Sequence, residues 1–156
     1  IYGGKPFKMG IDFFMRAAKA IEEKGSLRNF VELELANNKK IFGYGRPIAT
    51  TDERIPHVIN FAKEHGLGNG KHLQLALDLA LMMKELKGVE MNVAAIYCAL
   101  GADLGFNSDE FHLFMTPCFF AGMPPCFVEA SENPPGSFLP IRCDRIAYDG
   151  VSKRQW

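Results

Sequence analysis

The sequence has no excess of charge of either sign, because Lys+Arg and Asp+Glu both number 18 among 156 residues. A balanced chain has no overall attraction to nucleic acid or to an anionic membrane surface. Hydrophobic residues make up 47% and charged residues 23%, which are ordinary values for a globular protein. This length and composition predict one domain with a hydrophobic core and no nucleic-acid partner.

The sequence also lacks an apolar run that is long enough to span a bilayer. The most apolar helical pattern, Leu73–Met83, is interrupted by Gln74 and Asp78, whereas a spanning helix needs about 20 predominantly apolar residues. There is no signal-peptide pattern. We therefore expect no membrane partner and a cytoplasmic location. The chain begins at Ile1 without a methionine. Two further expectations are that it is a processed product, located in an organelle matrix, or that it is a piece of a longer protein.

Cysteine is scarce, and no two cysteines are spaced as CxxC. The surroundings of the four are mostly apolar, which predicts reduced, buried thiols rather than disulfides or a metal site. The four are Cys98, Cys118, Cys126 and Cys143.

Strand signals are absent, and apolar residues at three- and four-residue spacing predict an all-α fold. Helices are expected over 7–24, from Ser26 to Asn37-Asn38, from Thr51 or Asp52 to Gly66, from Asn69 to Gly88, over 91–104, and from Ser108 onward. The inward faces of the first and fourth helices are predicted as Phe7, Ile11, Phe14, Ala18 and Ile21, and as Leu73, Leu77, Ala80, Leu81 and Leu86.

Because the last helix contains prolines, the sequence does not decide where this helix ends. The helix either continues past Pro117 or breaks there, and Pro124-Pro125 could be the first turn of a further helix over Ala121–Ser131. Proline and glycine then dominate residues 133–140, which predicts a linker or an arm.

No familiar catalytic motif is present: the sequence has no HExxH, Walker loop, GxSxG or GxGxxG. The four histidines form no cluster, and each is more simply a surface or capping residue than a base. They are His57, His65, His72 and His112.

The most distinctive stretch is the glycine-rich loop within Lys39–Arg54, KKIFGYGRPIATTDER. Glycines let backbone N–H groups approach a ligand, and flanking cations suit a phosphate or carboxylate. The alternative is a solvated connection between two helices, which is the commoner use of such a loop. The candidate cations are Lys39, Lys40, Arg46, Arg54, Arg142 and Arg145.

Taken in order, six segments resemble the C-terminal part of the citrate synthase family, which includes citryl-CoA lyases and the lyase module of ATP-citrate lyase. The segments resemble, in turn, the family's His-Gly-Gly, Gly-Phe-Gly-His, Asp-Pro-Arg, Pro-Asn-Val-Asp, Phe-Thr-Pro and Arg-x-x-Tyr-x-Gly motifs. In this chain they are Tyr2-Gly3-Gly4, Ile41–Pro47, Asp52-Glu53-Arg54, Met91–Ala94, Met115-Thr116-Pro117 and Arg145–Gly150.

The resemblance implies a small helical domain over 1–107, returning large-domain helices over 108–132, and a proline-rich arm and tail over 133–156. In this family an acyl-CoA and a dicarboxylate meet in a cleft between the two domains, where an aspartate acts as base and histidines polarise carbonyls. A homodimer or a companion large-domain chain is implied, with coenzyme A or an acyl-CoA as ligand and no covalently bound cofactor or metal.

The chain departs from the family at the chemistry. Tyr2 replaces the first histidine, as an aromatic does in the lyase branch; Arg46 stands at or beside the loop histidine. Ala94 replaces the aspartate, and Met123 falls where synthases carry an arginine. Neither alanine nor arginine can act as general acid or base at working pH.

The resemblance therefore implies binding without ordinary synthase chemistry. Its candidate residues are Tyr2 and Arg46 at substituted catalytic positions, Ile41, Gly43, Tyr44 and Gly45 for CoA, and Arg54 and Arg145 for a carboxylate. One hypothesis is a non-catalytic or regulatory subunit. Another is a divergent citryl-CoA lyase or synthase using substituted residues or a companion chain. A third is a helical module whose loop binds nothing.

Overall fold

The computed structural model describes residues 4–23, 25–38, 40–46 and 51–132. Within these ranges the regular structure is all helical, as predicted. Tyr44 and Met91 also form an isolated antiparallel β-bridge. The helices are α1 (Gly4–Glu22), α2 (Leu27–Asn38), α3 (Arg54–Glu64), α4 (Lys71–Lys87), α5 (Val93–Asp103) and α6 (Ser108–Glu132).

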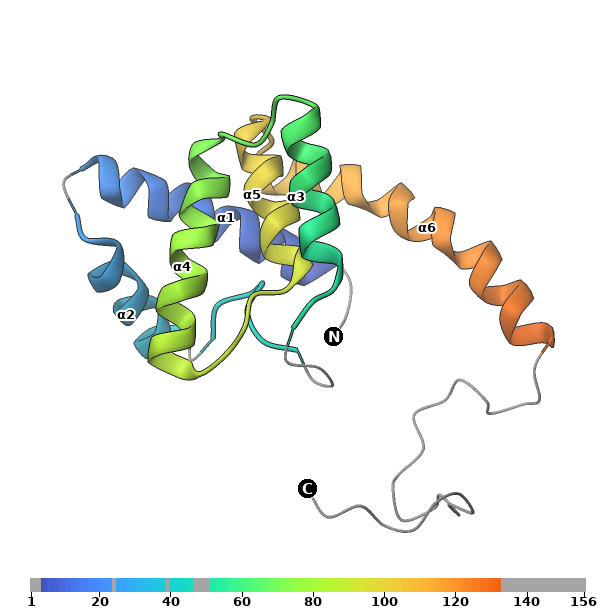
Figure 1. The fold of residues 1–156 in the computed structure, drawn as a ribbon, viewed down its shortest axis with the longest axis horizontal. Coiled ribbons are helices and arrows are strands. Elements are labelled where there is room, and N and C mark those ends of the chain that lie inside the picture. Colours follow the sequence, from blue (N-terminus) through green and yellow to red (C-terminus); the bar gives the residue numbers. More distant parts are fainter. Residues whose placement is uncertain (1–3, 24, 39, 47–50, 133–156) are drawn as a thin grey trace, which may run out of the picture. The chain divides into compact units, whose positions relative to one another are not determined.

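The helix α5 occupies the middle of the core. It packs against α1, α4 and α3 (Figure 1). Its sequence is apolar nearly all round, and the residues that it buries are small, so neighbouring helices can approach closely. A Cβ on Gly101, for example, would lie 2.6 Å from the Cε2 atom of Phe111. The prediction that this segment is buried is confirmed.

Helix α1 follows its predicted apolar stripe for most of its length. Ile11 and Phe14 are fully buried, and Phe13 packs edge-on against Phe14. Ile21, which was expected to face inward, is 39% exposed because the helix ends at Glu22, beyond the covered part of its surface.

Helix α4 presents a different face from the one predicted. The buried residues are His72, Leu73, Leu75, Ala76, Leu79 and Met83. Leu81, which was expected in the core, is 74% exposed. Leucine recurs at every second position from Leu73 to Leu81, and such a period of two marks no single face of a helix.

Helix α6 continues through Pro117, Pro124 and Pro125 to Glu132. Proline has a φ that suits a helix, so the cost is lost N–H donors rather than a necessary end. The division of the chain into two compact units falls within this helix, between Pro117 and Cys118. The predicted division at residue 107 stays a prediction.

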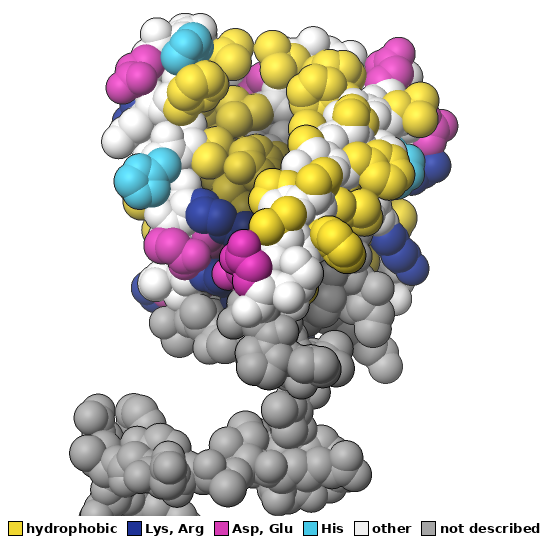
Figure 2. Space-filling view, turned by 90° about the vertical axis from the view of Figure 1, so that its right-hand side faces the viewer, with side chains coloured by type: hydrophobic (Ala, Val, Ile, Leu, Met, Phe, Trp, Pro, Cys, Tyr) yellow, Lys and Arg dark blue, Asp and Glu magenta, His cyan; other side chains and the backbone are white. Residues whose placement is uncertain are grey.

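Most of the side chains of α6 are apolar and exposed. Figure 2 shows exposed hydrophobic side chains in yellow on one face of the molecule. By length and composition α6 is sufficient to cross a bilayer, with a mean hydropathy of 1.3 in a window that is 6% buried. The expectation that no apolar run reaches this length was wrong for α6, because the helix continues through its prolines, which the sequence left open. The predicted absence of a membrane partner stays a prediction.

The cysteines also differ from expectation. Cys98 is a buried free thiol, and burial raises its pKa to about 12. Cys118 and Cys126 are exposed thiols on α6, which corrects the prediction that they are buried. Their apolar neighbours lie on an uncovered helix rather than in the core. Cys143 and the predicted 133–156 arm lie outside the described residues.

Candidate functional site

The glycine loop is held by the segment that leads into α5. The backbone N–H of Gly45 donates to the carbonyl of Glu90 at 2.6 Å, and the N–H of Asn92 donates to the carbonyl of Gly43 at 2.8 Å. The Asn92 side chain donates to the carbonyl of Gly45 at 2.9 Å. These backbone groups of the loop are therefore already paired within the chain.

Close packing explains the loop's glycines. Gly43 has φ +96°, and a Cβ there would lie 2.7 Å from the Cβ of Ala95 on α5. Gly45 has φ +89°, which an L side chain rarely adopts. The sequence suggested ligand approach as the reason for glycine, whereas the structure shows approach of the loop to a helix.

The side chains of the two other residues predicted for CoA lie inward. Ile41 is 4% exposed and belongs to the core. The Tyr44 hydroxyl donates to the carbonyl of Ala76 at 2.9 Å, and burial raises the pKa of Tyr44 well above its ordinary value. Both residues anchor the loop to the helices beneath it. CoA binding at the loop stays a prediction.

Asp52 joins the start of α3 to the start of α5. Its side chain is fully buried and accepts hydrogen bonds from Arg54 Nε and Nη2, each at 2.8 Å, and from the N–H of Val93 at 2.8 Å. It also accepts from the Arg54 N–H at 3.2 Å. The paired Arg54 guanidinium, with these N–H groups, holds the pKa of the Asp52 carboxyl well below its usual range.

A second arginine completes this cluster. Arg46 Nη1 donates to the Thr51 carbonyl at 2.6 Å and to Glu53 Oε2 at 2.8 Å, and lies 3.9 Å from Asp52 Oδ1. Arg54 keeps 55% of its side chain exposed. We call Arg46, Asp52, Glu53 and Arg54 the arginine cluster. The sequence placed Asp52 at a helix start and in the segment that resembles Asp-Pro-Arg, but its contact with Val93 could not be predicted, because it spans 41 residues.

The arginine cluster lies at the first turn of α5. Asn92 caps this helix by accepting from the N–H of Ala94 at 3.0 Å. Ala94 is next to Val93, which contacts Asp52, and the methyl group of Ala94 can take part in no proton transfer. One turn further on, Tyr97 packs 6.4 Å from Phe7, measured between ring centroids. Asp52 chiefly, with smaller contributions from Glu53 and Tyr97, raises the pKa of Arg54 against the lowering effect of burial.

His112 lies over the first residue of α1, a contact that no sequence signal indicated. A Cβ on Gly4 would lie 2.0 Å from His112 Cε1, so glycine is required at that position. The Nδ1 atom of His112 is buried without a hydrogen-bond partner. The predicted catalytic residue Tyr2, the candidate cation Lys39 and the predicted carboxylate ligand Arg145 lie outside the described residues.

The described part of the chain contains no group of three or more His, Cys, Asp and Glu side chains that could hold a metal ion. The arrangement at the start of α5 instead combines two guanidinium groups, a buried carboxylate and a phenol. Such groups can bind and orient an anion, and the described residues there include no histidine or free carboxylate positioned as a base.

No family model matches the chain, and no curated protein matches it either. Among solved structures the chain is similar to the citryl-CoA lyase from Hydrogenobacter thermophilus, with a TM-score of 0.61 and 22% sequence identity. The match covers 99% of this chain and 60% of the lyase chain. This similarity shows that the chain has the citrate-synthase-like helical fold that the sequence predicted. The chain spans about 60% of the length of its structural neighbour.

Proposed function

We propose that this protein binds a CoA thioester, a di- or tricarboxylate, or both, with ordinary citrate synthase chemistry lost. The observation that carries the proposal is the arginine cluster fixed to the first turn of α5, with Ala94 beside it. The cluster offers cationic groups to an anion beside Ala94, the position at which the family carries its proton-transferring aspartate. A citrate-synthase-like fold supports this choice of ligand class.

The cluster has a cation that a ligand can reach. Arg54 is bound by Asp52 through Nε and Nη2, and none of the hydrogen bonds described for this chain uses its Nη1. Glu53 is 74% exposed where it meets Arg46, so a ligand carboxylate can replace it at little cost. The buried Asp52 meanwhile fixes the Arg54 guanidinium in one orientation, which favours binding of a planar carboxylate.

The loss of chemistry follows from the residue types. Removal of a positioned general acid or base typically slows a reaction by about 10²–10⁴-fold. Ala94 cannot accept a proton, and Arg46 stays charged at any working pH. A non-catalytic or regulatory subunit is the corresponding role. We place the protein in the cytoplasm. We further propose that it forms a homodimer or binds a companion chain, because α6 exposes apolar side chains that an interface would cover.

The second candidate is a divergent citryl-CoA lyase or synthase, which the lyase among the structural neighbours favours. Here Tyr2, Arg46 or a companion chain would supply the missing groups. Replacement of Arg46 with alanine would then remove citryl-CoA cleavage without unfolding the protein. Unchanged turnover in that variant would count against this candidate, and turnover comparable to ordinary synthases would contradict the first.

Calorimetric titration of Arg54→Ala with citrate, oxaloacetate and CoA tests the binding site itself. We expect carboxylate affinity to fall about 10-fold or more, the value of one charged hydrogen bond. Arg28→Ala is the matched control, because Arg28 is also a half-exposed arginine that pairs with carboxylates, Glu32 and Glu85. Equal affinities in wild type and Arg54→Ala, with both folded, would favour a helical module whose loop binds nothing.

A further inference from the structure

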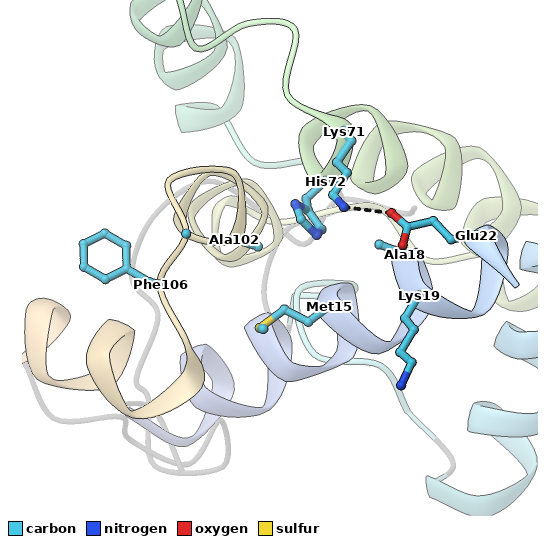
Figure 3. A pocket seen from close by; sticks show the side chains of 9 residues that line it. Met15, Ala18, Lys19, Glu22, Lys71, His72, Ala102 and Phe106 are labelled. Carbon is cyan, nitrogen blue, oxygen red and sulfur yellow. Dashed lines mark hydrogen bonds and ion pairs between the residues drawn. The ribbon is translucent and has the colours of Figure 1, made fainter.

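A second site lies at the other end of α5, away from the arginine cluster. A pocket of about 200 Å³ is formed there by Met15, Ala18, Lys19, Glu22, Lys71, His72, Ala102, Gly105 and Phe106 (Figure 3). The 11 residues of α5 separate the two sites by about 15 Å of helix axis. The pocket is smaller than the ~300–1,000 Å³ of drug-sized ligand sites, which excludes CoA and indicates a small molecule.

The polar centre of this pocket is His72, which Asp103 fixes in position. The Asp103 carboxylate, at the end of α5, accepts from the backbone N–H of His72 at 2.8 Å and of Leu73 at 2.9 Å. His72 Nδ1 lies 2.8 Å from Asp103 Oδ1. Gly70 permits this approach, because a Cβ there would lie 1.9 Å from Asp103 Oδ2.

This contact determines the tautomer of the His72 ring. An ionised carboxylate only accepts hydrogen bonds, so Nδ1 carries the proton and the lone pair of the neutral ring lies on Nε2. His72 is 7% exposed and lines the pocket. Its Nε2 atom has no hydrogen-bond partner among the described residues and is not fully buried, so it is open to the pocket.

A cationic side chain and several apolar side chains line the pocket beside His72 Nε2. Lys71 Nζ donates to Glu22 Oε1 at 2.9 Å across the edge of the pocket, and Figure 3 shows this pair beside the His72 ring. Both side chains of the pair are more than 60% exposed, at 63% and 64%, so a ligand can exchange with Glu22 at little cost. Met15, Ala18 and Ala102 supply the apolar wall.

We propose that this pocket binds a small monocarboxylate with a short apolar chain, with its carboxylate between Lys71 Nζ and His72 Nε2. A carboxylate only accepts hydrogen bonds, so the ring must donate to it from Nε2, and both ring nitrogens carry protons in the complex. The other charged groups that line the pocket or contact the ring are Lys19 and Glu22 on α1 and Asp103 on α5. Asp103 stabilises the imidazolium.

Imidazole NMR of the whole chain, titrated with sodium butyrate, tests this site. Long-range ¹H–¹⁵N spectra are expected to show His72 as the Nδ1–H tautomer at first, and as the doubly protonated ring after saturation. Lys71→Met should weaken butyrate about 10-fold, through loss of a charged hydrogen bond, while Glu22→Gln should strengthen it by removing the competing carboxylate. His72→Gln should abolish saturable binding.

The control is His65→Gln, which replaces an exposed histidine whose Nδ1 contacts the Phe61 carbonyl; it should bind butyrate as the wild type does. The site would be overturned by a free His72 in the Nε2–H tautomer, by no saturable change at His72, or by equal affinities in Lys71→Met, Glu22→Gln and wild type. Inorganic phosphate is titrated in parallel, and binding as tight as that of butyrate would overturn the role of the apolar wall.

Discussion

Asp52 connects the candidate binding residues to the fold, because its buried carboxylate contacts both Arg54 and the start of α5. The same carboxylate lies 3.9 Å from Arg46. Stability and the proposed ligand binding would therefore both depend on Asp52, and the two effects can be separated by varying the pH and the arginines independently.

Replacement of Asp52 with asparagine should lower the free energy of unfolding at neutral pH by about 2 kcal/mol, through loss of charged hydrogen bonds. The Arg54 guanidinium lowers the pKa of Asp52 in the folded state. The contribution of the Asp52 carboxylate to the free energy of unfolding is therefore present above the unfolded-state pKa of about 3.9. It is lost as pH falls toward the lower folded-state pKa. Urea titrations between about pH 7 and pH 2 measure this, and the variant should show a flatter acid decline.

Asp109→Asn serves as the control, since Asp109 pairs with Lys8 on the surface with 74% of its side chain exposed. It should unfold as the wild type does at neutral pH. An Asp52→Asn variant with the wild-type pH profile would show that the Asp52 contacts contribute no stability.

Gly43→Ala should lower the free energy of unfolding by about 2–4 kcal/mol, from left-handed backbone strain and overpacking together. A Cβ at this position meets Ala95 at 2.7 Å. Gly66 also has a positive φ, +75°, but nothing lies within 4 Å of a Cβ there, so Gly66→Ala should cost only about 1 kcal/mol. Thermal or urea unfolding compares them, and equal losses would contradict the packing explanation for the glycine loop.

At the level of helices, the bounds of α1 to α5 lay within a few residues of those predicted, because glycine, asparagine and the 3.6-residue period are local signals. The inward face of α4 was not predicted, since alternating leucines fit no single helix face. The length of α6 was left open for another reason: proline has a helical φ, so its presence in the sequence did not settle whether the helix continues past Pro117.

The contacts that build the sites were beyond sequence reasoning. Asp52 meets Val93 across 41 residues, and Asp103 meets His72 across 31. Nothing local distinguishes these aspartates from ordinary caps or surface residues. The glycine loop, in contrast, was found from composition, but its role in packing against α5 required the structure.

The start of α5 provides a test of how one helix end supports the loop. Asn92→Ala removes both the cap to Ala94 and the bond to the Gly45 carbonyl, and should cost about 2 kcal/mol. Asn92→Asp keeps the cap acceptor but loses the donor, so its loss should be smaller. Urea denaturation ranks the two, and an aspartate variant as unstable as the alanine variant would assign the stabilisation to the loop contact alone.

At the scale of the whole molecule, the exposed apolar side chains of α6 are the candidate for an interface. Phe120 and Phe127 are 61% and 74% exposed, and apolar surface of this extent typically marks an interface. The double variant Phe120→Glu/Phe127→Glu should reduce self-association measured by sedimentation over about 1–100 μM, because charges cannot be buried cheaply at a contact.

Leu33→Glu on α2 is the control, since Leu33 is an exposed apolar residue, at 64%, outside α6. It should sediment as the wild type does. A wild-type protein that is monomeric at every concentration, or one whose association is unchanged in the α6 double variant, would contradict self-association through α6.

The central proposal is that this protein keeps a binding site for a CoA thioester or a carboxylate but lacks the acid–base groups of ordinary citrate synthases. Calorimetric titration of the longest soluble form with acetyl-CoA, with and without saturating oxaloacetate or citrate, tests this most directly. We expect binding near micromolar affinity, tightened by the carboxylate and weakened in Arg54→Ala but not in Arg28→Ala, without turnover. No heat from any ligand with a folded protein, or turnover like that of an ordinary citrate synthase, would contradict it.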